Sequence, residues 1–429
     1  MTTTTNFIIT ALILTFIIAH KICQKRRYKN AYKGELYKRI NKFQLLFSII
    51  SAIIFFIFLI VNLIPLGTNP TTKEYIMCIV NALTIALATF PVSLENLYIR
   101  TFKQDEEKYS HTKTIITNII DNELIKKFNK ADINVIILNE KKNKDNIKMI
   151  KEEDITSKLL KSTIQIKTSN PKILDKKIDK SNTIKEFKDL ESIYNRIERA
   201  RGVHDNFIRT YQYLLKIYIP IILSYLFLTF LGFPIVYNIL LIALLKLFTM
   251  LTSEYLYRKL PFAKDIMTRK VKPANIIMGK QETLLTIIEA FLIFFMLTIP
   301  YMSLMAQGLS TAFVHTIYIS TFLFINIFLT YSSLSDSFFF IDIFRYIKVI
   351  RIHIYNIICI LFVLFINYIH TFETRNITLR NEVACFVIAI ITVLATEVIK
   401  IARYSTKRGR KKYENKNNKK SRRSKSNNS

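Results

Sequence analysis

The most regular feature of this chain is a series of long apolar runs, separated by stretches rich in lysine and arginine. Each run is close to the roughly 20 residues that an α-helix needs to cross a hydrocarbon core about 30 Å thick. The pattern predicts a polytopic, all-α membrane protein with about nine transmembrane helices. The expected spans are residues 6–22, 43–65, 75–95, 210–232, 234–254, 283–302, 309–331, 350–369 and 383–402.

The basic residues predict which side of the membrane each connection faces. Threading the nine expected spans alternately places residues 21–42, 255–281 and 403–429, all strongly basic, on one side. Because Lys and Arg accumulate in cytoplasmic connections, we expect the N-terminus outside and the C-terminus in the cytoplasm. The first span carries its basic flank on its C-terminal side, which indicates a membrane anchor rather than a cleaved signal peptide.

Composition narrows the class of protein further. The 429 residues include 62 Lys and Arg against 31 Asp and Glu, and 51% of them are hydrophobic, which is not the composition of a soluble enzyme. The net charge of +31 lies in the connections and the tail, so the positive-inside rule explains it; we expect the lipid bilayer as a partner, and no nucleic acid. The four cysteines have no CxxC spacing, which predicts neither a metal site nor a disulfide framework.

One long polar segment interrupts the apolar pattern. Within residues 102–206, the stretches ADINVIILNE and KSTIQIKTSN predict strands and DNIKMIKEEDITSKLL predicts a helix, so we expect a small α/β insert. Three spans precede it in residues 1–101, and six follow it in residues 207–403. Residues 404–429 form a basic tail with no apolar period, which predicts disorder. The tail could bind anionic lipid, or it could be an ordinary positive-inside anchor.

Four short stretches follow one another along the chain: ATFPVSLENL, ERARGVHDNFIRTYQYLL, LPFAKDIMTRKVKP and ATEVIKIARY. In this order they resemble the P-type cation-transporting ATPases. The resemblance implies that the spans correspond to the membrane half of such a pump and the insert to a reduced phosphorylation domain. It also implies that the loop LPFAKDIMTRKVKP, which begins at Leu260, lies under the membrane domain and contacts the insert.

The chain departs from that family wherever ATP chemistry is needed. Thr112 stands at the position of the phosphorylated aspartate, and a threonine cannot form an acyl phosphate. Asn139, Glu140 and Lys141, with residues 168–171, stand where the resemblance places carboxylates that hold Mg²⁺. The actuator and nucleotide domains have no counterpart. We expect a non-catalytic membrane scaffold or partner subunit with no cofactor and no bound metal.

The expected cation site has changed in the same way. Pro91 keeps the helix break of the family's fourth span, and Glu95 lies nearly one turn beyond the family's glutamate position. Tyr218, Lys246 and Met250 occupy positions where the resemblance implies oxygen ligands for a cation. Oxygen ligands have therefore been replaced by apolar side chains and one amine.

Three charged or polar side chains within the spans leave alternatives open. Lys246 is either a fixed cation paired with Glu95 or Glu289, or a side chain that snorkels to water. Glu289 and His315 either belong to a proton path or are structural polar contacts between helices.

Two other functions remain possible besides the scaffold. The chain is then one half of a split ATP-driven pump, or an ion transporter that does not use ATP.

Overall fold

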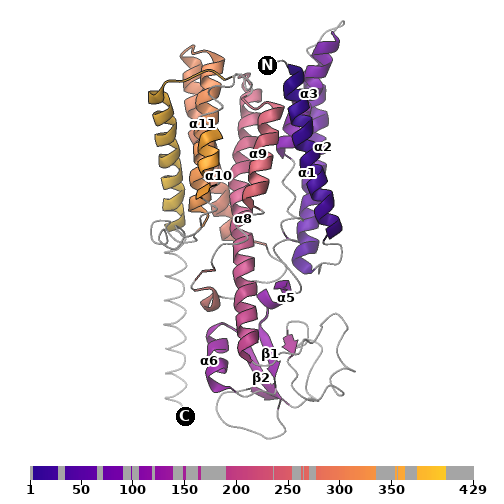
Figure 1. Cartoon of the computed structure of the whole chain (residues 1–429), viewed down its shortest axis with the longest axis vertical. Helices are drawn as coiled ribbons and strands as arrows, with labels where there is room; N and C mark the ends of the chain where they lie inside the picture. The colour runs from indigo at the N-terminus through magenta and orange to yellow at the C-terminus, as the bar shows by residue number, and fades with distance from the viewer. Residues whose placement is uncertain are drawn as a thin grey trace.

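The computed structural model is dominated by long helices that run roughly parallel to one another, with a small sheet at one end (Figure 1). The described residues are 3–27, 34–64, 71–89, 98, 106–117, 121–138, 148–150, 163–165, 190–234, 236–253, 262–263, 265–269, 277–334, 353–354, 356–362 and 374–401.

Three helices form the N-terminal part of the bundle. They are α1 (Thr3–Arg27), α2 (Glu35–Leu63) and α3 (Thr72–Thr89). The helices α2 and α3 pack along each other, and the hydroxyl of Thr89 donates to the hydroxyl of Ser51 at 3.0 Å where they meet. Many apolar side chains of α2 are exposed, as expected for a helix that faces lipid.

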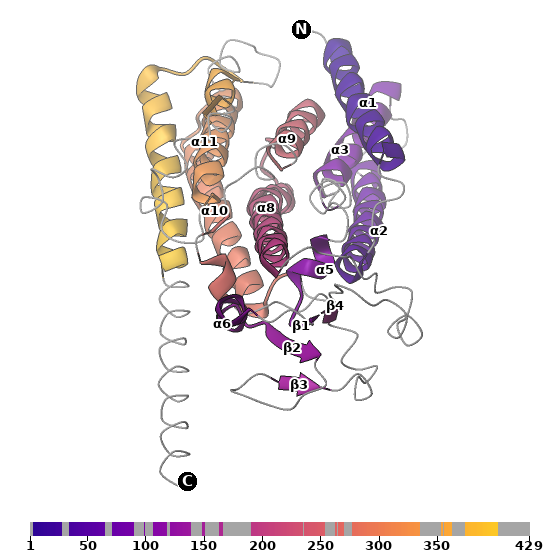
Figure 2. The ribbon, with the colours of Figure 1, turned by 60° about the horizontal axis from the view of Figure 1, so that its bottom comes forward.

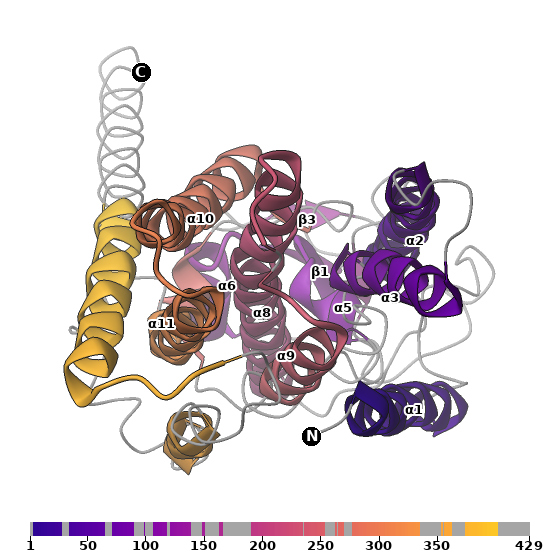
Figure 3. The ribbon, with the colours of Figure 1, turned by 90° about the horizontal axis from the view of Figure 1, so that it is seen from above.

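The longest helix joins the sheet to the bundle. Helix α8 (Leu190–Phe230) has 41 residues, which corresponds to a length of about 60 Å. Its first turns pack against the sheet, and the rest lies in the middle of the bundle between α10 and α3 (Figure 3). The boundary we predicted between the insert and the membrane domain, residues 206 and 207, therefore falls inside one continuous helix.

The C-terminal part of the bundle contains four further long helices among the described residues. Helix α9 (Ile239–Leu251) begins at Asn238, whose side chain accepts the amide of Leu241 at 2.8 Å. It is followed by α10 (Lys280–Ala306), α11 (Thr311–Ser332) and a helix at Leu379–Ile401. Among the described residues, five helices are long and apolar enough to cross a membrane: α2, α8, α10, α11 and the helix at Leu379–Ile401.

The prediction of a polytopic, mainly helical membrane protein is therefore consistent with the structure, whereas the count of nine spans stays a prediction. Of the predicted eighth span, 350–369, the structure describes only residues 353–354 and 356–362. The predicted disordered tail, 404–429, lies outside the described residues.

The insert contains a parallel sheet with the strand order β3-β2-β1-β4. Its strands are β1 (Thr114–Thr117), β2 (Asn134–Leu138), β3 (Lys148–Ile150) and β4 (Thr163–Gln165). Strands at both predicted positions are present. The helix that we predicted over DNIKMIKEEDITSKLL is wrong at Lys148–Ile150, because these residues pair with β2 at an edge of the sheet. Three residues are too few for the apolar period to distinguish a strand from a helix.

Two short helices accompany the sheet. Helix α6 (Asn122–Lys130) connects β1 to β2, and its first amides are capped by the side chain of Asp121. Helix α5 (Glu106–Ser110) lies beside α8. Side chains from α6, β1, β2 and the first turns of α8 form one apolar core, which includes Ile115, Phe128 and Ile197.

The loop that resembles a pump motif is docked under the bundle. Its short 3₁₀ helix η6 (Ile266–Thr268) places Ile266 and Met267 in the apolar core of the insert. Phe262 packs directly over Gly202 of α8, where a Cβ atom would lie 2.2 Å from the ring. The expected contact between this loop and the insert is present, and Figure 2 shows the sheet beneath the lower end of α8.

Candidate functional site

Two of the acid–base pairs in the described part of the chain are more than nine-tenths buried on both sides, where ionised groups are costly. On α8, the ammonium of Lys216 forms an ion pair with the Glu289 carboxylate on α10; their side chains are 4% and 1% exposed. Four residues further along α8, Pro220 has no N–H, so the carbonyl of Lys216 cannot receive the usual intrahelical hydrogen bond. The pair therefore lies where the helix backbone is locally interrupted.

The second pair is on the helix at Leu379–Ile401. The ammonium of Lys400 lies 2.7 Å from Oε1 of Glu397, and the hydroxyl of Ser332, at the end of α11, donates to the same oxygen at 2.5 Å. Lys400 also donates to the backbone carbonyl of Ser332. The carboxyl end of α11 thus receives a cation, which is the favourable sign for the helix dipole.

The two pairs form one electrostatic cluster, hereafter the charge cluster: Lys216, Glu289, Glu397 and Lys400. Lys400 lies near enough to both members of the first pair to interact with them electrostatically. Two ammonium groups and two carboxylates sum to zero charge. Such a neutral arrangement lowers the cost of burying ions, which is several kcal/mol or more for an isolated ion.

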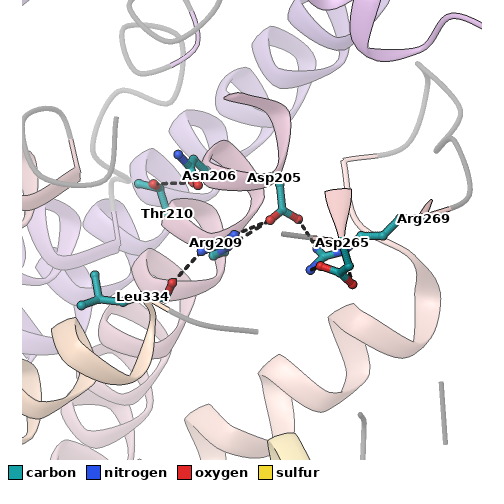
Figure 4. A network of polar contacts seen from close by, with 7 residues as sticks. All are labelled: Asp205, Asn206, Arg209, Thr210, Asp265, Arg269 and Leu334. Atoms are coloured by element: carbon teal, nitrogen blue, oxygen red, sulfur yellow. Dashed lines mark hydrogen bonds and ion pairs between the residues drawn. The ribbon is translucent and has the colours of Figure 1, made fainter. Parts of the chain in front are cut away.

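A second polar network, hereafter the loop network, begins at the docked loop (Figure 4). The guanidinium of Arg269 binds Asp265 at 2.7 Å and Asp205 of α8 at 2.9 Å. Asp205 also pairs with Arg209, and Arg209 donates to the carbonyl of Leu334 at 2.6 Å, just beyond α11. This network and the charge cluster therefore meet the same end of α11.

Lys246 does not pair with Glu289, which the Lys216 ammonium occupies; one of the two predicted partners is therefore wrong. Instead, its ammonium lies 5.1 Å from the centroid of the Tyr218 ring, within the range of a cation–π contact. The hydroxyl of Tyr218 is hydrogen-bonded to Thr249 at 2.8 Å, which fixes the ring. The Lys246 side chain is 6% exposed and so does not snorkel out of the bundle. The other predicted partner, Glu95, lies outside the described residues.

The remaining predicted site residues are dispersed. Met250 is buried in α9, whereas Pro91 lies outside the described residues. Thr112 is buried just before β1 begins, at the amino end of that strand. Open parallel sheets bind ligands at the carboxyl ends of their strands, so Thr112 lies at the opposite end. The segments 139–141 and 168–171 are outside the described residues.

His315 lies in a group of buried aromatic side chains. Its ring stacks on Tyr301 with a centroid separation of 6.1 Å, and the Tyr301 hydroxyl donates to the carbonyl of Pro234 at 2.7 Å. The hydroxyls of Tyr237 and Tyr318 are hydrogen-bonded to each other at 2.6 Å beside it. These contacts join α10 and α11, which fits the structural interpretation of His315.

Sequence reasoning missed Lys216, Glu397 and Lys400. A signal for them exists, since each is an ionisable residue within a predicted span, and such residues are rare unless they pair. The resemblance drew attention to Tyr218 and Lys246 nearby and away from Lys216. Among the described residues, no group of three His, Cys, Asp or Glu side chains could hold a metal ion.

Comparison with known proteins adds no family to this description. No protein-family model matches the chain, and no curated protein matches it.

Proposed function

We propose that this chain is a non-catalytic, multi-pass membrane scaffold or partner subunit, related to the membrane half of the P-type cation-transporting ATPases. The observation that carries the proposal is the buried pair between Lys216 and Glu289. A carboxylate in the interior of such a bundle would attract a cation, and here a fixed ammonium neutralises it. The charge cluster as a whole is neutral, so the bundle is stabilised by its own side chains.

The insert supports the same proposal. Its parallel sheet packs against the foot of α8, and the docked loop joins the same apolar core. This is the contact that the resemblance implies between a phosphorylation domain and the loop below the membrane domain. Thr112 cannot replace the aspartate nucleophile, and it lies at the amino end of β1. A remnant of the domain would then serve to brace α8 rather than to transfer a phosphoryl group.

The proposed topology has nine spans, an external N-terminus and a cytoplasmic insert and C-terminus. In support, α1 begins at the end of the bundle remote from the sheet, and the helix at Leu379–Ile401 ends on the side of the sheet (Figure 1). Single cysteines introduced into residues 262–269 should be labelled by an impermeant reagent only after cells are broken. Labelling of intact cells would reverse the proposed orientation.

The experiment that tests the function is phosphorylation and transport by the purified chain. We expect no ATP-dependent, hydroxylamine-sensitive phosphoenzyme, and no ATP-driven cation uptake in proteoliposomes, with or without co-purified proteins. Thr112→Asp should restore neither. A phosphoenzyme in the wild-type chain would overturn the proposal, and one that forms only with a co-purified protein would indicate a split pump.

One observation favours a second candidate, an ion transporter that does not use ATP. The charge cluster connects α8, α10 and the helix at Leu379–Ile401, and chains of acids and bases across helices can relay protons. Proton flux in proteoliposomes that is lost in Glu289→Gln would favour this candidate over the scaffold.

A further inference from the structure

A large groove opens between α2, α8 and α10 on the half of the bundle nearer the sheet. Its volume is about 1080 Å³, slightly above the upper end of the range of roughly 300–1,000 Å³ typical of ligand pockets. The walls are apolar over most of their length; they are lined by Phe43, Leu46 and Phe47 of α2, Ile219 and Ile222 of α8, and Ile287 of α10.

The mouth of the groove has the opposite character. Lys38, Arg39 and Lys42, all exposed, line it on the first turns of α2. Among the lining residues that the structure describes, one is acidic: Glu35, which bonds Lys38 at 3.3 Å. The described lining residues on these first turns of α2 thus carry three cations and one carboxylate, and the Tyr211 ring also lines the groove. Basic and aromatic residues of this kind gather at the interface between lipid headgroups and the hydrocarbon core.

The apolar length of the groove matches one leaflet of a bilayer. Along α8 the lining extends from Tyr211 to Ile222, about 17 Å at 1.5 Å per residue. Half of a hydrocarbon core is about 15 Å thick. On α2 the lining changes from charged to apolar residues at Phe43. A molecule with an anionic head and a hydrocarbon chain fits this order, with its head at the basic residues and its chain along the apolar walls.

We propose that this groove binds an anionic glycerophospholipid of the leaflet nearer the sheet. The phosphate would lie against Lys38, Arg39 and Lys42, and an acyl chain would lie between α2, α8 and α10. The lining residues that the structure describes lie on α2, α3 and α8, and on α10 and the residues just before it.

The chain contains no tryptophan, which makes a direct test available. Leu46→Trp places one tryptophan in the groove, and Leu45→Trp places one at a neighbouring position of α2 that does not line it. Leu45 and Leu46 are 63% and 52% exposed, so neither substitution disturbs the core. The full-length protein is reconstituted with phosphatidylglycerol or phosphatidylcholine whose acyl chains carry bromine, which quenches tryptophan fluorescence on contact.

We expect phosphatidylglycerol to be preferred over phosphatidylcholine at Leu46→Trp by about fivefold or more, since a basic residue near an anionic surface contributes about fivefold in affinity. The preference should be weak at Leu45→Trp. Replacing Lys38, Arg39 and Lys42 with Gln should abolish it at Leu46→Trp. The matched control replaces Lys126, Lys127 and Lys130 of α6 with Gln; it removes the same charge away from the groove and should leave the preference intact.

Equal preferences at the two tryptophan positions would overturn the proposal, because they would describe general attraction of anionic lipid to the protein. A preference that survives the substitutions at Lys38, Arg39 and Lys42 would also overturn it. The proposal would also be wrong if the substitutions on α6 reduced the preference as much as those at Lys38, Arg39 and Lys42.

Discussion

Glu289 on α10 pairs with Lys216 on α8, and not with Lys246 on α9. The ammonium of Lys246 lies over the ring of Tyr218 instead. The two lysines therefore have different described contacts inside the bundle, and the two can be tested separately.

Removing one member of the Lys216–Glu289 pair should be much more harmful than removing both. Lys216→Met or Glu289→Gln alone should lower the free energy of unfolding by about 3–5 kcal/mol, because the other charge stays buried. The double variant should be substantially milder. Thermal denaturation of the four proteins in detergent measures this coupling. Additive losses would show that the pair does not interact.

The cation–π contact of Lys246 can be separated from its other interactions by changing the ring. Tyr218→Phe keeps an aromatic face and loses the hydrogen bond to Thr249, whereas Tyr218→Leu loses both. Lys246→Met should couple to Tyr218→Leu by about 1–2 kcal/mol and should couple little to Tyr218→Phe. Equal coupling to the two substitutions would mean that the ring face contributes nothing.

Phe262 packs closely on Gly202, so the effect of Gly202→Ala on stability should change sign when the Phe262 ring is removed. Gly202→Ala should destabilise the protein, because the added Cβ lies 2.2 Å from the ring and displaces the docked loop. In a Phe262→Ala background the same substitution should stabilise it by up to about 1 kcal/mol, since alanine favours a helix over glycine. Melting temperatures of the wild-type protein and the three variants measure both effects. If Gly202→Ala destabilised the protein in both backgrounds, the Phe262 ring would not be the group that the added Cβ meets.

The buried carboxyl of Glu107, where α2 meets the insert, predicts that the stability of the protein depends on pH. Its carboxylate accepts the amide of Leu36 at 2.9 Å and the hydroxyl of Tyr98, yet burial outweighs these bonds and raises the pKa of the carboxyl above its ordinary value. The folded state then binds a proton more tightly than the unfolded state. Stability from this group is fully present below the unfolded pKa and declines as the pH rises through the folded pKa.

Glu107→Gln should therefore remove part of the loss of stability between acidic and neutral pH. Glu123→Gln, on the exposed first turn of α6, removes one carboxylate away from this joint and serves as the control. The measurement is the melting temperature at a series of pH values between pH 4 and pH 8. If the melting temperature of Glu107→Gln changed with pH as steeply as that of the wild-type protein, the prediction would be wrong.

The sequence predicted the helices well because the requirement they satisfy is local. An apolar run of sufficient length forms a helix in a membrane whatever its neighbours are, and eight of the nine predicted spans overlap helices of the described residues by most of their length. The apolar patterns of ADINVIILNE and KSTIQIKTSN, which predicted strands, were local signals as well. Lys148–Ile150 was mispredicted because pairing with β2, and not its own pattern, makes it a strand.

The charge cluster could not be predicted in the same way. Whether Glu289 meets Lys216 or Lys246 depends on how α8, α9 and α10 are rotated about their axes, and that rotation is decided by packing of the whole bundle. The sequence does show that Lys216, Glu397 and Lys400 are ionisable residues in predicted spans. It does not show which of them are neighbours.

The central claim is that fixed ammonium groups neutralise the interior carboxylates in place of a bound cation. The most direct measurement is the melting temperature of the purified protein in Na⁺, K⁺, Ca²⁺ or a large organic cation at constant ionic strength. We predict no difference for the wild-type protein, a cation-dependent stabilisation for Lys216→Met, and its loss in Lys216→Met/Glu289→Gln. A saturable stabilisation of the wild-type protein by one cation, absent in Glu289→Gln, would contradict the claim, since Glu289 would then bind a cation despite Lys216.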